Sequence, residues 1–127
     1  MFTVFKDYTF AAAHAIRGHT RGCQNLHGHN YRVRVHVGSD TLDELGMVID
    51  FVDLKAILNE VLGHFDHAVI NDHPPFDAER NTTAEELSRY TFEEVSARLD
   101  DPLMVRKVEV WENDTACAIY ETSPPTP

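Results

Sequence analysis

The chain has 127 residues, 43% of them hydrophobic and 25% charged, and a formal net charge of −10 at pH 7. This length forms one domain around a single core, and the composition is that of an ordinary globular protein. The acidic balance argues against nucleic-acid binding, which needs a basic surface, although a few local cations can still bind a small anionic substrate.

Targeting and membrane segments are not expected. The sequence has no apolar run near the roughly eighteen residues that a membrane-spanning helix needs, and its first residues lack the basic and apolar regions of a secretory signal. Two cysteines do not make a disulfide framework. We therefore expect a cytoplasmic protein with free thiols and no membrane partner.

The first third of the chain predicts two strands joined by a loop. Residues 3–12 are rich in β-branched and aromatic residues, which indicates a strand ending near His14. Residues 15–26 have two glycines and mixed polarity, which is typical of a loop. In residues 27–37 the apolar Tyr31 and three valines alternate with polar residues, as in a half-buried antiparallel strand.

Two helices are predicted next. Asp50 or Asp53 can cap the first helix. Thr82 or Thr83 can cap the second, because each has a glutamate three residues on, as in a capping box. The expected helices span residues 53–63 and 83–98.

The C-terminal part predicts two further strands, at 104–112 and 116–121, and a disordered tail at 122–127. A proline-containing loop over 71–81 separates the two helices. The resulting order of elements is an α+β pattern, with both helices on one face of an antiparallel sheet. We therefore expect a single domain over residues 1–121.

His27 and His29 form the sharpest local feature. On a strand, residues two apart point to the same side with their Cα atoms about 6–7 Å apart, so both imidazoles can bind one ion. His14, at the end of the preceding strand, can supply a third ligand if the two strands pair. Three histidines leave one position of a zinc ion open, which is the catalytic arrangement.

Other interpretations of these residues stay open at this point. A His-x-His pair also occurs by chance on a solvated strand. Cys23, four residues before His27 in a glycine-flanked loop, is either a reactive thiolate favoured by a nearby cation or a fourth zinc ligand that closes a structural site. Cys117 is expected to be an inert core residue. The histidines expected to be merely solvated are His19, His36 and His73.

Five motifs follow one another along nearly the whole chain: Phe10-Ala-Ala-Ala-His14, Cys23-x-x-x-His27-Gly-His29, Gly46-Met-Val-Ile-Asp50-Phe51, Asp66-His67-x-x-Ile-Asn71 and Glu112. In this order they resemble the 6-pyruvoyltetrahydropterin synthase and 6-carboxytetrahydropterin synthase family. The three-residue gap between Cys23 and His27 is similar to that of the bacterial 6-carboxy-5,6,7,8-tetrahydropterin synthases of queuosine precursor synthesis.

The resemblance implies a tunnelling fold, in which a four-stranded antiparallel sheet carries two helices on one side. It also implies oligomerisation: three subunits join their sheets into a barrel, and two trimers form a homohexamer with active sites at subunit interfaces. The implied substrate is 7,8-dihydroneopterin triphosphate, which loses triphosphate and acetaldehyde to leave 6-carboxytetrahydropterin.

The resemblance also implies roles for individual residues. Zinc held by the three histidines is implied to act as a Lewis acid, with Cys23 as the base. Asp66 polarises His67, which donates or shuttles a proton. Adjacent residues of a strand point to opposite faces, so this pair cooperates directly only in a turn or helix end, or across a subunit interface.

Glu112 is implied to anchor the pterin ring, because a carboxylate can accept two parallel hydrogen bonds. Its parity with two valines of the same strand places it on the apolar face, where an unpaired charge is costly. A buried ion pair with an arginine is the alternative. Thr83 and Glu85 match a family segment that lines the pterin pocket, although Thr82 stands where that segment usually has proline and a capping box also explains Glu85.

Two rival functions remain compatible with the sequence. One is formation of 6-pyruvoyltetrahydropterin, or a related cleavage of the pterin side chain, at the same zinc. The other is a zinc- and pterin-binding protein without turnover. The residues Cys23, Asp66 and His67 argue against the second, since binding alone does not need them.

Overall fold

The structure is a computed structural model that describes residues 1–122. It contains two long strands, β1 (Phe2–His14) and β2 (His27–Ser39), then helix α1 (Phe51–Leu62), a very short strand β3 (Ala68–Val69), helix α2 (Ala84–Ser96) and the strands β4 (Met104–Asn113) and β5 (Ala116–Glu121). Single 3₁₀ turns, η1 (Gly63–Phe65) and η2 (Ile70–Asp72), flank β3. The predicted order of the four long strands and the two helices is confirmed. The tail predicted at 122–127 lies, apart from Thr122, outside the described residues.

The strands form one sheet in the order β3-β1-β2-β4-β5. The four long strands are antiparallel, as predicted, whereas β3 pairs in parallel with the end of β1 through Ala12 and Ala13. The prediction of four strands was therefore incomplete, because a two-residue strand is too short to show a period in the sequence. This fifth strand brings the Asp66–His67 segment to the edge of the sheet beside β1.

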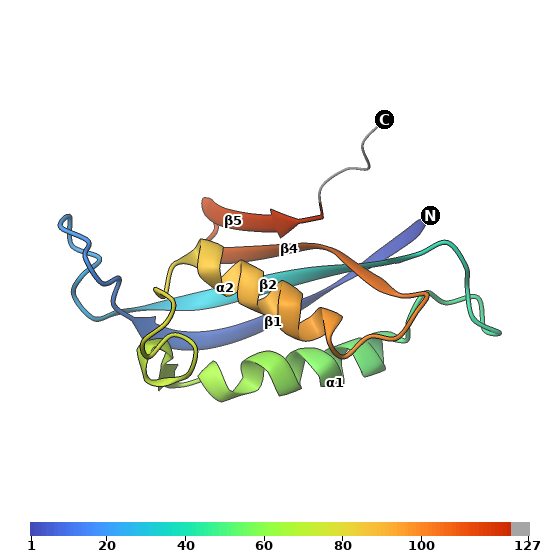
Figure 1. Ribbon diagram of the computed structural model, residues 1–127, viewed down its shortest axis with the longest axis horizontal. Helices are drawn as coiled ribbons and strands as arrows, with labels where there is room; N and C mark the ends of the chain where they lie inside the picture. The colour runs from blue at the N-terminus through green and yellow to red at the C-terminus, as the bar shows by residue number, and fades with distance from the viewer. Residues whose placement is uncertain (123–127) are drawn as a thin grey trace.

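Both helices cover the same face of the sheet, with α1 over β1 and α2 over β4 and β5 (Figure 1). The core lies between them, since alternate residues of each strand face the helices. Its strand side consists of the valines of β2 and β4, and its helix side of leucines and a valine; the fully or almost fully buried members include Val33, Val35, Val37, Val108, Val110, Leu54, Leu58, Leu87 and Val95. None of the helices in residues 1–122 has the length and apolar character needed to cross a bilayer.

Helix α1 begins two residues earlier than predicted because Asp50, rather than Asp53, is its N-cap: the Asp50 side chain accepts a hydrogen bond from the backbone N–H of Val52 at 2.8 Å. We expect Asp50→Ala to lower the free energy of unfolding by about 1 kcal/mol, the usual contribution of such a cap. Asp53→Ala is the matched control, since an acidic residue in the first turn contributes only about 0.3 kcal/mol. Urea titration of both variants at one protein concentration measures the difference; equal losses would contradict the assignment.

Candidate metal centre and active site

The three predicted histidines meet at one point. In the antiparallel pairing of β1 with β2, His14 lies opposite His27, and Ala12 lies opposite His29. Because these residues alternate along their strands, all three imidazoles project from the helix-covered face. One ring nitrogen from each histidine lies within 4.8 Å of the other two, close enough for a single metal ion to be bound by all three.

The backbone orients two of the rings toward this point. The Nδ1 of His14 donates to the carbonyl oxygen of Thr82 at 2.6 Å, and the Nδ1 of His27 donates to the carbonyl oxygen of Asn25 at 2.7 Å. A ring that donates from Nδ1 presents an unprotonated Nε2, the form that binds metals. Burial lowers the pKa of His14, which further favours the neutral imidazole.

The buried nitrogens support a metal ion as the missing partner. The Nε2 atoms of His14 and His29 are buried and have no hydrogen-bond partner among the residues that the structure describes. A buried, unpaired nitrogen costs free energy unless a ligand satisfies it. The donor set and its geometry therefore fit a metal centre with three protein ligands, as the sequence predicted.

Cys23 lies outside this cluster of donor atoms. It is partly buried in the 15–26 loop, and His14 and His27 stand at the two ends of that loop. A closed site with Cys23 as the fourth ligand is thus not the arrangement observed. Its role as the base stays a prediction.

Glu112 lies beside the metal centre. It shares the helix-facing side of β4 with Val108 and Val110, and its Oε2 lies 3.8 Å from the Nε2 of His29. Its side chain is 24% exposed, so the carboxylate is half-buried but reachable. The nearest nitrogen given for this carboxylate belongs to His29, and no arginine pairs with Glu112 among the described residues, so the alternative of a buried ion pair with an arginine is not observed.

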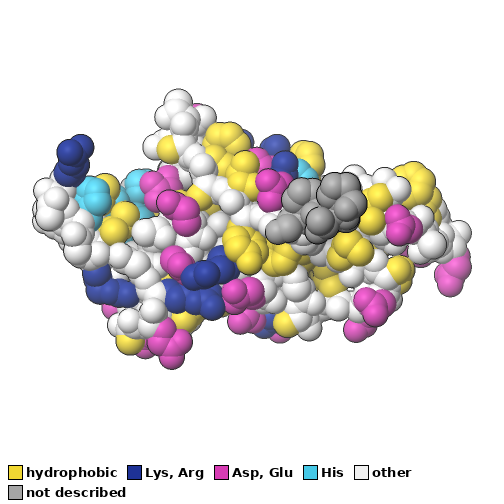
Figure 2. All heavy atoms as spheres, turned by 45° about the horizontal axis from the view of Figure 1, so that its top comes forward, with side chains coloured by type: hydrophobic (Ala, Val, Ile, Leu, Met, Phe, Trp, Pro, Cys, Tyr) yellow, Lys and Arg dark blue, Asp and Glu magenta, His cyan; other side chains and the backbone are white. Residues whose placement is uncertain are grey.

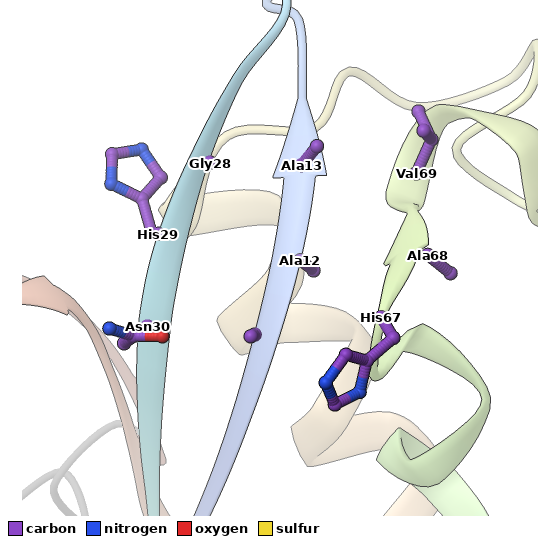
Figure 3. Close-up of a pocket in the computed structure, with 9 residues that line it drawn as sticks. Ala12, Ala13, Gly28, His29, Asn30, His67, Ala68 and Val69 are labelled. Atoms are coloured by element: carbon purple, nitrogen blue, oxygen red, sulfur yellow. The ribbon is translucent and has the colours of Figure 1, made fainter.

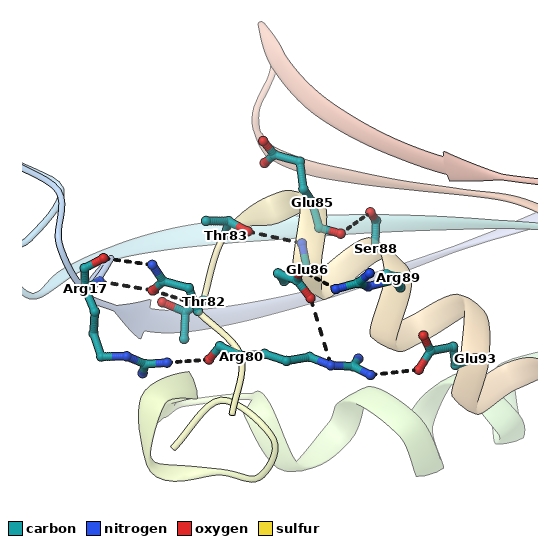
Figure 4. A network of polar contacts seen from close by, with 10 residues as sticks. Arg17, Arg80, Thr82, Thr83, Glu85, Glu86, Ser88, Arg89 and Glu93 are labelled. Atoms are coloured by element: carbon teal, nitrogen blue, oxygen red, sulfur yellow. Dashed lines mark hydrogen bonds and ion pairs between the residues drawn. The ribbon is translucent and has the colours of Figure 1, made fainter. Parts of the chain in front are cut away.

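A pocket of about 470 Å³ opens next to Glu112, between the start of α2 and the start of β5. The residues predicted to hold the pterin, Thr83, Glu85 and Glu112, all line it. Thr83 caps α2 by accepting the N–H of Glu86 (Figure 4). Because Thr83 rather than Thr82 is the cap, capping does not explain Glu85, whose exposed carboxylate is available to a ligand.

Asp66 and His67 form a pair within one turn after η1. His67 has a positive φ of 57°, and its Nδ1 lies 3.1 Å from Oδ1 of Asp66. The same Oδ1 accepts the N–H of Ala11 at 3.0 Å, which holds the pKa of Asp66 below its usual range. The turn that direct cooperation requires is therefore present, and the carboxylate beside His67 is ionised.

His67 stands on the β3 side of the metal centre, whereas Glu112 stands on the β4 side. Its side chain is 84% exposed. Together with His29 it lines a shallow groove floored by small residues of β1 and by Gly28 (Figure 3). His67 thus lies across β1 from His27 and His29, about 10 Å from β2 by strand spacing.

Three other residues differ from the expectation. His36, expected to be merely solvated, is partly buried, and its Nε2 lies 2.6 Å from Oε2 of Glu109. Cys117 is exposed on the edge strand β5 and lines the pocket beside Glu112, so its assignment to the core was wrong; an edge strand leaves one flank open to solvent. His19, expected to be merely solvated, is partly buried and lines the same pocket. Figure 2 shows histidine and acidic side chains gathered at this end of the molecule.

A helix-backed antiparallel sheet whose strand ends bring three histidines together, with a carboxylate-lined pocket beside them, is the arrangement of a tunnelling-fold protein. The chain belongs to the 6-pyruvoyl tetrahydropterin synthase family, whose sequence model matches residues 3–123. This membership places it among pterin-forming enzymes.

Individual relatives agree with this assignment. The chain is 34% identical to the 6-carboxy-5,6,7,8-tetrahydropterin synthase of Haemophilus influenzae, over 95% of this chain and 99% of the relative. It is 36% identical to the protein of the same name from Synechocystis, over 94% and 93%. The solved 6-pyruvoyl tetrahydropterin synthase of Caenorhabditis elegans superposes with a TM-score of 0.83 at 26% identity, over 96% of both chains.

Proposed function

We propose that this protein is a zinc-dependent 6-carboxy-5,6,7,8-tetrahydropterin synthase. The reaction converts 7,8-dihydroneopterin triphosphate and one water molecule into 6-carboxy-5,6,7,8-tetrahydropterin, acetaldehyde and triphosphate. The observation that carries the proposal is that the Glu112 carboxylate lies 3.8 Å from His29, so that the proposed pterin anchor would stand directly beside the proposed metal ion. Relatives with this name span almost the whole chain.

Zinc is the proposed ion because three neutral imidazoles and an open position are its usual catalytic ligand set. When bound, it would act as a Lewis acid toward the hydroxyl oxygens of the substrate side chain. His14, His27 and His29 would hold it. Glu112 would accept two parallel hydrogen bonds from the ring N–H and the exocyclic amino group of the pterin.

The proton transfers are assigned to three other side chains. Cys23, as the thiolate, would remove protons from the hydroxyl-bearing carbons of the substrate side chain. His67 would return or shuttle a proton, and Asp66 would stabilise its charged form through their 3.1 Å contact. Thr83 and Glu85 would complete the walls of the pterin pocket.

The assembly proposed is a homohexamer of two stacked trimers, located in the cytoplasm. The sheet has two open edges: β5 at one side and, at the other, most of β1, since β3 covers only its last residues. Open edges favour pairing with another chain. Such pairing would place the exposed His67 of one subunit at the metal centre of a neighbour.

Product analysis tests the reaction. With dihydroneopterin triphosphate as substrate, the zinc-loaded protein is expected to release acetaldehyde and 6-carboxytetrahydropterin, as measured by trapping the aldehyde and by mass spectrometry of the pterin. A pyruvoyl product without acetaldehyde would establish the neighbouring activity instead. Equal null rates for the wild type and Cys23→Ala on every pterin tested would replace the enzyme with a binding protein. If 6-carboxytetrahydropterin is the product found, we propose that it feeds 7-deazapurine synthesis, as for queuosine.

A further inference from the structure

His19 is a polar residue of the pocket beside Glu112 to which the proposed reaction gives no role. It lies in the 15–26 loop, is partly buried, and lines the pocket together with Glu85 and Glu112. Partial burial in a loop is unusual for a histidine that is merely solvated. Its contacts therefore need an explanation.

The Nδ1 atom of His19 faces the backbone of its own loop. It accepts hydrogen bonds from the N–H groups of Arg21 and Cys23, both at 3.2 Å. A nitrogen that accepts hydrogen bonds carries no proton, so the proton of the neutral ring is on Nε2. The Nδ1 atom of His19 thus holds the backbone N–H of Cys23 and that of Arg21, two residues before it.

The carbonyl side of Cys23 is held as well. Its oxygen accepts the N–H of Ile16 at 2.8 Å. The residues on either side of Ile16 are fixed by two asparagine side chains: Asn71 bonds both backbone groups of Ala15, at 2.9 Å each, and Asn81 bonds both backbone groups of Arg17, at 3.0 and 2.8 Å.

These contacts make a rigid frame on one side of Cys23. The Arg17 guanidinium adds a bond to the carbonyl oxygen of Phe76 at 2.8 Å and a second to that of Arg80 (Figure 4). The frame bonds Cys23 directly through the Cys23 carbonyl oxygen. The Cys23 N–H is bonded instead by the side chain of His19, which can be replaced without removing any side chain of the frame.

We infer that His19 is a positioning residue for Cys23: its Nδ1 fixes the backbone N–H of the residue that carries the thiol, in the same loop from which the His19 side chain lines the pocket beside Glu112. The inference rests on the proposed role of Cys23 as the base. Holding a base in position lowers the entropic cost of reaching the transition state. Loss of this positioning therefore lowers kcat rather than raising KM.

Two substitutions of His19 separate this role from a direct contact with substrate. The side-chain oxygen of asparagine takes the place of Nδ1, whereas that of glutamine takes the place of Nε2. In the zinc-loaded full chain, His19→Gln is expected to speed hydrogen exchange of the Cys23 and Arg21 amides by about tenfold, the factor for one hydrogen bond. His19→Asn is expected to retain the wild-type exchange rates. NMR of both variants measures this without any catalytic assay.

The kinetic expectation follows the same division. The kcat of His19→Gln is expected to be about tenfold below that of His19→Asn, with similar KM values. Wild-type amide protection in His19→Gln would overturn the inference, as would a raised KM with intact kcat in His19→Asn, because that pattern assigns Nε2 to the substrate. If Cys23→Ala keeps wild-type activity, the proposed base fails, while the exchange rates still report whether His19 holds the loop.

Discussion

Replacing His29 with alanine is expected to empty the metal centre and abolish turnover. The Nε2 of His29 is buried without a hydrogen-bond partner among the described residues and lies 3.8 Å from Oε2 of Glu112. Two remaining imidazoles bind zinc weakly, so metal content should fall from about one ion per chain to well below it. Losing a Lewis acid worth several kcal/mol lowers kcat/KM by about a thousandfold or more. Elemental analysis and the acetaldehyde assay measure the two effects.

His27→Ala is expected to behave in the same way, since its Nε2 completes the same triangle of donor atoms. The control is His67→Ala. Its side chain is 84% exposed, so this variant should keep its zinc while losing activity. Unchanged zinc in both His27→Ala and His29→Ala would refute the site, whatever their activities.

The metal centre was predictable from sequence because strand geometry is local. Two histidines on alternate residues of a strand share a face whatever the rest of the fold does. The same parity placed Glu112 correctly with Val108 and Val110 on the helix-facing side. Pairing of β1 with β2 then needed only a loop between adjacent antiparallel strands, which is the commonest connection. The third ligand, His14, therefore followed from topology.

Other features depend on contacts between distant segments and could not be predicted in this way. Strand β3 exists because the His67 N–H donates to the Ala11 carbonyl oxygen and Asp66 accepts the Ala11 N–H; nothing in the residues of β3 itself indicates a strand. The exposure of Cys117 follows from its edge position, which an apolar sequence does not report.

His19 was assigned to solvent because a histidine in a loop has no periodic signal. Its bonds to the Arg21 and Cys23 amides arise from the turn that the 15–26 loop makes. Asn71 belongs to one of the five motifs, but its side chain likewise bonds the backbone of a distant residue, Ala15, which is 56 residues away in the sequence. Side-chain to backbone bonds of this kind are specified by the whole fold, so a single sequence names the residues without their partners.

Mixing two inactive variants is expected to restore activity if the active site is shared between subunits. His67→Ala retains an intact metal centre, and His29→Ala retains an intact Asp66–His67 pair. In a mixed oligomer, a His67→Ala chain that lies next to a His29→Ala chain forms one complete site across their interface. Random assembly of equal amounts gives about a quarter of the wild-type sites. Co-expression with two affinity tags, followed by tandem purification, yields the mixed species for the acetaldehyde assay.

The control for this experiment is a mixture of His27→Ala with His29→Ala, which damages the same cluster in every chain and should show no recovery. No recovery for His67→Ala with His29→Ala, in oligomers that carry both tags, would place His67 at the metal centre of its own chain. The structure makes recovery the expected outcome. His67 is almost fully exposed at the sheet edge, on the β3 side of the histidines, whereas Glu112, the proposed pterin anchor, lies on the β4 side. A substrate held between Glu112 and the three histidines would therefore lie over β2, with β1 between it and its own chain's His67, so the exposed His67 is available to a neighbour.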